Sequence, residues 1–353
     1  MSSRVRLGAQ TRVTLKELLV NQTAVPDDFF KQNWTLRPLN ESNDTRLQTL
    51  VVGEQKTTVF VEYKPFHLRR RATEPSDTVK ARVASLAKPL SIPATAESGF
   101  SVLQCIGILR QDIPTTMFAF VFRLPDVAAP ADPILPTSLS AAIVSDDHVR
   151  PTLNEKFKLA GSLTRSVTQF HSINWVHKSI RSENVLLIPS SSTLPVPNNP
   201  RLLEYSRPYL VGFEFSRLAS DRSTDEVDDI LSRNLYRSPG RWGPPEESFS
   251  VLDDIYALGV TLLEIGIWRP LIKFQDNFSD ISADDVKRCL IQHAEHRLPH
   301  YMGEDYTQAV LKCLKGDFGS PDERRSFGPD SVELNMLMGS EVTARIETGV
   351  RLE

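Results

Sequence analysis

The sequence predicts an α+β fold built from a strand-rich first part and a larger helical second part. Alternating and β-branched apolar runs dominate up to residue 123, whereas apolar residues at helical spacing dominate after residue 135. Between these regions lies the proline-rich stretch 125–133, whose composition is typical of a linker. We therefore predict two lobes, preceded by an extension that partly joins the first lobe and followed by a tail. The predicted ranges are 1–44 for the extension, 45–124 and 125–320 for the lobes, and 321–353 for the tail.

The first lobe is expected to contain strands and one helix. Two β-branched runs, separated by a break that contains Gly53, predict a hairpin with strands at 47–52 and 57–64. Pro65 should end the second of these strands because proline has no N–H to donate. Ser76 is a suitable N-cap for a helix over 77–88, whose apolar residues recur at spacings of three and four. Further strands are predicted at 102–109 and 117–122.

The second lobe is expected to be mainly helical. Apolar residues share one face of a predicted helix around 157–170, and the stretch 252–268 is apolar nearly all round, which indicates a buried helix. An amphipathic helix is predicted at 306–314, with short strands at 185–188 and 209–211. The stretch 190–208 is rich in Ser, Pro and Asn and predicts an exposed loop. No strong periodicity follows residue 321.

The composition excludes several classes of protein. Of the 353 residues, 40% are hydrophobic and 24% are charged, which is a globular balance. A net charge of −3 argues against a nucleic-acid-binding surface or a polybasic membrane module. The three cysteines form no CxxC pair, so the sequence indicates neither a zinc site nor a disulfide framework. Glu264 interrupts the most apolar stretch, which is too short to span a membrane. We expect a soluble cytoplasmic protein.

Five short motifs follow one another in a specific order. The first is a strand that ends at Lys64, followed by the predicted helix, two strands, the linker and a long helix. The remaining four are His177-Lys178-Ser179-Ile180-Arg181-Ser182-Glu183-Asn184, then Leu210-Val211-Gly212-Phe213-Glu214-Phe215, then Tyr236-Arg237-Ser238-Pro239, and finally Asp254-Ile255-Tyr256-Ala257-Leu258-Gly259.

This order resembles the protein-kinase fold over roughly residues 45–320, where the family has a strand lysine, H-R-D-L-x-x-x-N, D-F-G and A-P-E. The amino-acid sequence at 175–184 and 210–217 is similar to that of kinase-like domains of fungal proteins, which occur beside HeLo or prion-inhibition modules. The resemblance implies a small antiparallel β-rich N-lobe, a helical C-lobe and ATP as the cofactor. It also implies a catalytic loop of His177, Lys178, Ser179 and Arg181, a nucleotide cleft with Lys64, Asn184, Gly212 and Glu214, and structural roles for Phe213 and Asp254.

The residues that carry kinase chemistry are missing from this pattern. Ser179 occupies the place of the general base, and a hydroxyl does not accept a proton usefully at neutral pH. Gly212 replaces the aspartate that holds magnesium, so magnesium binding is doubtful and Asn184 is left as a weak ligand. The stretch 34–46 contains no glycine for a phosphate-binding loop, and the helix at 77–88 has no glutamate to pair with Lys64.

We therefore expect a pseudokinase that acts as a binding or switch module in signalling, with protein partners and weak or no ATP binding. One alternative is an active kinase in which Glu214 or Glu183 replaces the missing acids. Glu214 could serve if the segment is extended, because residues two apart then share a direction. Another alternative is an interaction domain that binds no nucleotide. Taken by themselves, His177 is expected to be a packing histidine and Asn184 an amide that braces the loop. The sequence does not specify the oligomeric state.

Overall fold

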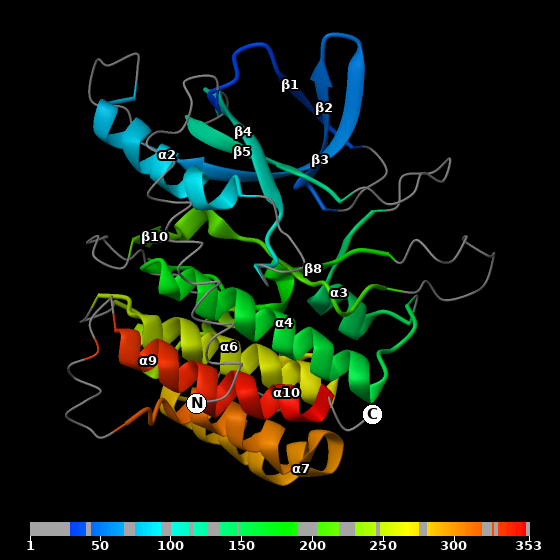
Figure 1. The fold of residues 1–353 in the computed structure, drawn as a ribbon, viewed down its shortest axis with the longest axis vertical. Coiled ribbons are helices and arrows are strands. Elements are labelled where there is room, and N and C mark those ends of the chain that lie inside the picture. The colour runs from blue at the N-terminus through cyan, green and yellow to red at the C-terminus, as the bar shows by residue number, and fades with distance from the viewer. Residues whose placement is uncertain are drawn as a thin grey trace. The chain divides into compact units, whose positions relative to one another are not determined.

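The computed structural model describes residues 29–39, 44–66, 75–92, 100–112, 116–125, 135–146, 148–189, 203–218, 230–244, 248–274, 281–319, 327 and 331–350. The chain divides into two compact units, one of residues 1–135 with 212–215 and one of residues 136–211 with 216–353. The first contains an antiparallel sheet and the second is mainly helical, so the predicted α+β class is correct (Figure 1). Most of the predicted linker at 125–133 and most of the predicted loop at 190–208 lie outside the described residues.

The described part of the first unit contains a five-stranded sheet in the order β1-β2-β3-β5-β4, and every neighbouring pair is antiparallel. The predicted hairpin and the two later strands are therefore confirmed, and β3 ends at the expected proline. The strands are β1 (Thr35–Pro38), β2 (Leu47–Val52), β3 (Gln55–Pro65), β4 (Gln104–Gln111) and β5 (Met117–Arg123).

The two faces of β3 bury different kinds of residue. Val59 and Val61 belong to an aliphatic cluster with Leu50, Leu109, Ala119 and Val121. Because successive side chains of a strand point to opposite faces, Phe60, Glu62 and Lys64 lie on the other face. The register pairs them with Phe122, Phe120 and Phe118 of β5. Glu62 and Lys64 thus lie on an aromatic face of the sheet.

Helix α2 (Asp77–Leu90) begins where the sequence predicted. The Ser76 hydroxyl accepts the N–H of Val79 at 3.4 Å, as expected of an N-cap. Val83, Leu86 and Leu90 are buried, and the helix packs against β4. Its spacing of apolar residues therefore explains which face it turns toward the sheet.

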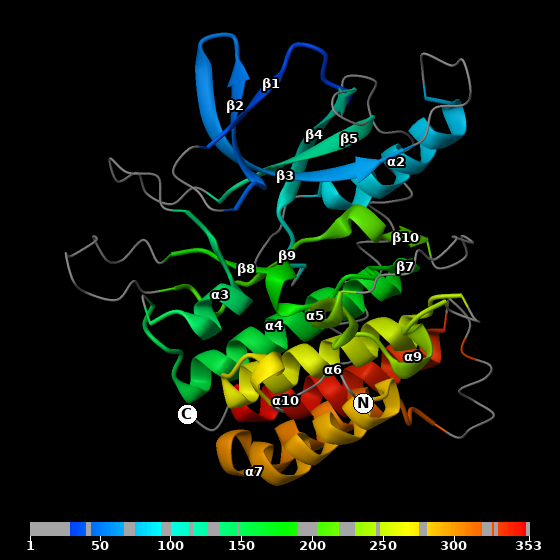
Figure 2. The ribbon, with the colours of Figure 1, turned by 180° about the vertical axis from the view of Figure 1, so that it is seen from behind.

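The second unit is organised around α6 (Val251–Ile267), which is buried along almost its whole length. It packs against α4 (Leu153–Ser172) and α7 (Ala283–Lys315), and these helices lie side by side in both views (Figures 1 and 2). Gly303, at φ 77°, interrupts α7, so the predicted helix at 306–314 forms the second half of α7. No described helix is long and apolar enough to cross a membrane.

Short strands connect the helices to the loop at 177–184. Strand β7 (Trp175–Val176) precedes this loop and pairs with β10 (Arg217–Leu218). Strand β8 (Val185–Leu187) follows it and pairs with β6 (Thr137–Ser138) and β9 (Tyr209–Leu210). The short helices α3 (Leu139–Val144) and α5 (Leu231–Asn234) complete this part. The strands predicted at 185–188 and 209–211 are confirmed, and the loop is held at both ends.

The region after residue 331 is part of the helical unit rather than a separate tail. It forms α9 (Val332–Leu337), a π-helix η6 (Met338–Thr343) and α10 (Ala344–Val350), which pack against α4 and α7. Its buried residues are Leu334, Met338, Val342 and Ile346, each four positions after the last. This spacing departs from the 3.6-residue period because the middle turn is a π-helix, so the periodicity was weak in the sequence.

Close packing between α6 and α7 requires Gly259. A Cβ added there would lie 2.6 Å from the Cβ of Cys313 and 3.2 Å from the backbone N of Leu314. We expect Gly259→Ala to lower the free energy of unfolding by about 1–3 kcal/mol through overpacking, measured by urea unfolding. Gly339→Ala is the control, because a Cβ there meets nothing within 4 Å. It should be neutral or slightly stabilising, and equal losses in both variants would contradict the proposed contact.

Candidate functional site

The loop at 177–184 is anchored by Asp254, a fully buried residue near the start of α6. Its carboxylate accepts the backbone N–H of His177 at 2.6 Å and of Lys178 at 2.9 Å. The Nε2 atom of His171, from α4, lies 3.1 Å from the same carboxylate. Lys178 has φ 67°, which is unfavourable for a lysine, and the bond from its N–H to Asp254 helps to hold this conformation.

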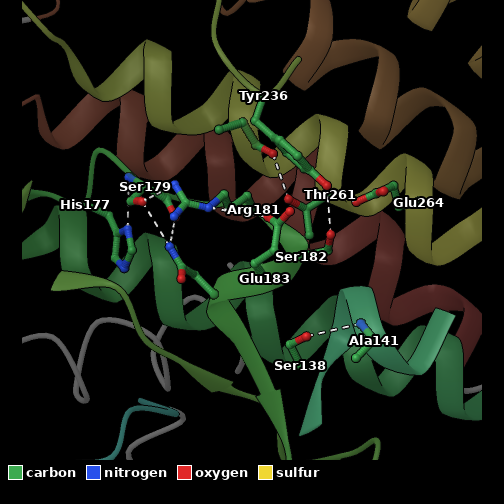
Figure 3. A network of polar contacts seen from close by, with 12 residues as sticks. Ser138, Ala141, His177, Ser179, Arg181, Ser182, Glu183, Tyr236, Thr261 and Glu264 are labelled. Carbon is green, nitrogen blue, oxygen red and sulfur yellow. Dashed lines mark hydrogen bonds and ion pairs between the residues drawn. The ribbon is translucent and has the colours of Figure 1, made fainter. Parts of the chain in front are cut away.

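Inside the loop, polar contacts converge on Ser179 (Figure 3). The Asn184 side-chain amide donates to the Ser179 carbonyl at 2.8 Å and to its hydroxyl at 2.9 Å. Arg181 donates to the same hydroxyl at 2.7 Å, and its Nε lies 3.4 Å from the Glu183 carboxylate. Asn184 therefore braces the loop, Ser179 is an acceptor within it, and Glu183 pairs with Arg181.

His177 is a buried, packed imidazole. Its Nδ1 accepts the N–H of Ser179 at 3.2 Å, and its ring meets Phe170 edge to face. Burial lowers the pKa of His177 to about 4, and the smaller opposing effect of Asp254 does not reverse this. The ring is therefore neutral at physiological pH, which agrees with the packing role that the sequence left open.

A second polar chain joins the end of the loop to α6. The Ser182 hydroxyl lies 2.7 Å from the Tyr236 hydroxyl, which donates to Glu264 at 2.5 Å (Figure 3). The backbone N–H of Leu271 donates to the other Glu264 oxygen at 2.8 Å. Burial raises the pKa of Glu264 to about 7. The sequence analysis used Glu264 only as an argument against a membrane span, although a lone acid in a buried helix already indicated a need for buried partners.

In the first unit, β3 holds the segment Gly212–Phe215 through two side chains. The Glu62 carboxylate accepts the backbone N–H of Gly212 with one oxygen and that of Phe213, at 2.7 Å, with the other. The Lys64 ammonium donates to the backbone carbonyl of Glu214. We call this arrangement the β3 clasp. It fixes the backbone of Gly212–Glu214.

The β3 clasp lies in an apolar environment. Glu62 is 5% exposed, and the ring of Phe213 stacks against Phe122 at a centroid distance of 6.5 Å. Burial raises the pKa of Glu62 to about 7, although the N–H groups of Gly212 and Phe213 act in the opposite direction. Gly212 has φ 92°, a conformation that other residues rarely adopt. Glycine here therefore serves the backbone geometry of the clasp.

Two details of the clasp differ from the sequence-based expectations. Residues Phe213–Phe215 form a 3₁₀ turn, η3, so the premise that Glu214 lies two residues along an extended segment from Gly212 is wrong. The predicted helix offered Lys64 no glutamate as a partner. In the structure, Lys64 donates a hydrogen bond to the backbone carbonyl of Glu214. Phe213 is buried, as expected of a structural residue.

Glu62 is the residue that the sequence analysis missed. A signal was present, because Glu62 lies two residues before Lys64 in a predicted strand and must share its face. An acid on an otherwise aromatic, buried face needs hydrogen-bond donors. What the sequence could not supply was the donor, since the segment that provides it lies 150 positions later.

The residues that the resemblance assigns to a magnesium site do not fit this ion. Magnesium is held through carboxylates in such sites, whereas this chain offers the amide Asn184, the hydroxyl of Ser179 and the side-chain-free Gly212. Among the described residues, no group of three or more His, Cys, Asp or Glu side chains could hold a metal ion.

Residues 126–350 match the model of a family described as a domain of unknown function, DUF7580. The chain belongs to the DUF7580 family. The matched range includes the loop at 177–184, α6 and the helices α9 and α10. The β3 clasp lies only partly within it, because Glu62 and Lys64 precede residue 126. No match to a curated protein was found.

The raised pKa of Glu62 makes one contribution to the stability of this DUF7580 protein depend on pH. Between pH 4.5, which is the ordinary pKa of a glutamate, and about pH 7, Glu62 is protonated in the folded state but ionised in the unfolded state. Stability from this group is therefore complete below about pH 4.5 and is lost as the pH rises to about 7, a change of about 3 kcal/mol. Urea unfolding of the wild type and of Glu62→Gln at a series of pH values should show their stability difference changing by this amount.

Taking the difference removes the effects of Glu264 and His177, which both proteins share. Glu54→Gln, in the exposed turn of the same hairpin, is the matched control. Its difference from the wild type should not vary over this pH range. If Glu62→Gln behaves like Glu54→Gln, Glu62 is not a buried proton-binding group.

Asp254 should be essential for the loop at 177–184. Asp254→Asn keeps the shape of the side chain but replaces one acceptor oxygen with an amide NH₂ group. The backbone N–H of either His177 or Lys178 then faces a donor and loses its hydrogen bond. We expect a loss of about 3 kcal/mol in the free energy of unfolding. The neighbouring Asp253→Asn affects a partly exposed helix cap and should cost about 1 kcal/mol. A small effect at Asp254 would mean that the loop has another anchor.

Proposed function

We propose that this chain is a protein-kinase-like pseudokinase, a binding or switch module in cytoplasmic signalling whose function is exerted through protein partners. The support comes from the positions of the motifs. Lys64 lies on β3, a strand of an antiparallel sheet, and the helix α2 follows β3 along the chain. The loop at 177–184 lies between two short strands and is anchored by Asp254 at the start of a buried helix. These positions are of the kind that the kinase resemblance implies, and they support the proposal.

The observation that carries the proposal is the β3 clasp. Val61-Glu62-Tyr63-Lys64 corresponds to V-A-I-K, in which the lysine contacts nucleotide phosphates in an active kinase. Here Glu62 takes the place of the alanine and binds the backbone of the segment that corresponds to D-F-G. Lys64 donates to the backbone of the same segment. Residues at nucleotide-handling positions thus have a structural function, which supports weak or no ATP binding.

The chemistry of the remaining positions supports the absence of phosphoryl transfer. Loss of a positioned general base lowers a rate by about 10²–10⁴-fold, and Ser179 is held as an acceptor by Arg181 and Asn184. Of the substitute acids, Glu183 pairs with Arg181, and Glu214 lies in a 3₁₀ turn. Neither observation favours an active kinase.

The proposal is tested by measuring autophosphorylation and ATP-dependent thermal stability, with magnesium and with a chelator. We expect no magnesium-dependent phosphate incorporation, and any rise in melting temperature with ATP should be the same under both conditions. Phosphate incorporation that requires magnesium and disappears in Lys64→Met would contradict the pseudokinase assignment.

Glu62→Ala separates a pseudokinase from a domain that does not handle nucleotides. Removing this carboxylate releases the backbone of Gly212 and Phe213, and it restores the alanine of the V-A-I-K pattern. If the chain is a pseudokinase in which the β3 clasp hinders ATP binding, ATP should raise the melting temperature of this variant more than that of the wild type. No response to ATP in either protein would favour the alternative, an interaction domain that binds no nucleotide.

A further inference from the structure

The helical unit contains a cavity of about 260 Å³ between α4 and α10. Its lining includes Phe157, Lys158, Gly161, Ser162, Arg165 and Glu347. The α4 residues lie on one side of the helix, since residues three or four positions apart, such as Phe157 and Gly161 or Ser162 and Arg165, share a face. None belongs to the loop at 177–184 or to the β3 clasp, so the cavity is separate from the site described above.

Arg165 and Glu347 form an ion pair in the lining of the cavity. Arg165 donates to the Glu347 carboxylate at 2.8 Å and to the Ser162 hydroxyl at 3.0 Å. Ser162 in turn donates to the backbone carbonyl of Ser206 at 2.9 Å. The guanidinium is thus held in place across α4 and α10, and its charge is neutralised by Glu347.

The other cation in the lining is not neutralised. Lys158 is half-buried, and within the part of the chain that the structure describes it has no hydrogen bond or ion pair. With Arg165 and Glu347 paired, the described lining has a net charge of +1. A half-buried ammonium without a counter-ion favours a ligand that carries one negative charge.

The remaining walls are apolar and leave real space. Phe157 is buried and contributes an aromatic wall, and Val350, the last residue of α10, also lines the cavity. Gly161 has no Cβ, and an added one would still lie 3.4 Å from Arg165 and 3.9 Å from Ile346. At about 30 Å³ for each water-sized group, the cavity holds on the order of nine non-hydrogen atoms.

We propose that this cavity binds a small organic monoanion, with a carboxylate that pairs with Lys158 and a flat apolar body against Phe157. A single ammonium matches a single negative charge, whereas a dianionic phosphate would also face the Glu347 carboxylate. The apolar walls require a hydrophobic body, so a bare anion such as acetate should bind less well. This site does not depend on the proposed kinase-like function.

The test uses benzoate, which combines the required charge, body and size. We expect a Kd on the order of 1 mM for a ligand of this size. Benzoate at about ten times this concentration should raise the melting temperature of the full chain by about 2 °C. Benzamide, which has nearly the same shape but no charge, and acetate, which lacks the apolar body, should have smaller effects. Ligand-observed NMR measures the same binding without relying on unfolding.

Three variants locate the binding. Lys158→Gln should weaken benzoate binding at least fivefold, whereas Lys273→Gln, which removes the same charge from an exposed position outside the lining, should leave it unchanged. Gly161→Leu should abolish binding by filling the cavity, and Gly161→Ala shows whether a side chain at this position is compatible with folding. The proposal is overturned if benzoate does not bind, if benzamide binds equally well, or if Lys158→Gln binds benzoate like the wild type.

Discussion

The described structure depends on buried carboxylates that accept backbone N–H groups. Asp254 takes the N–H groups of His177 and Lys178 and so decides the path of the loop at 177–184. Such an arrangement is stable only when the donors are fixed, because a buried carboxylate without donors would cost several kcal/mol. The short strands on both sides of the loop and the buried helix α6 supply that rigidity.

Glu62 uses the same interaction in the sheet unit, and there it has a different consequence. It binds the backbone at Gly212 and Phe213, while Lys64 binds the carbonyl of Glu214. A catalytic lysine must remain available to a substrate, whereas a structural lysine can be committed to the protein backbone. The proposed loss of catalysis therefore involves new contacts as well as missing acids. These contacts stabilise the segment in one conformation and place an acid with a pKa near 7 beneath it.

The helices after residue 331 are held to the rest of the helical unit by buried side chains and ion pairs. Their buried residues pack against α4 and α7, and ion pairs join Arg165 to Glu347 and Lys312 to Glu341. The family match also reaches residue 350. These helices thus contribute to the core and, together with α4, line the cavity beside Lys158.

The sequence by itself determined the strands and helices whose patterns are local. The hairpin at β2–β3, the Ser76 cap of α2 and the buried character of α6 follow from alternation, capping and helical spacing within short windows. Under the proposed kinase-like assignment, Ser179 and Gly212 take the places of the two acids. The tertiary structure alone decided which groups meet Glu62, Lys64 and Glu264, because their partners come from distant segments. It also decided that residues 338–343 form a π-helix that packs against α4 and α7, which come earlier in the chain.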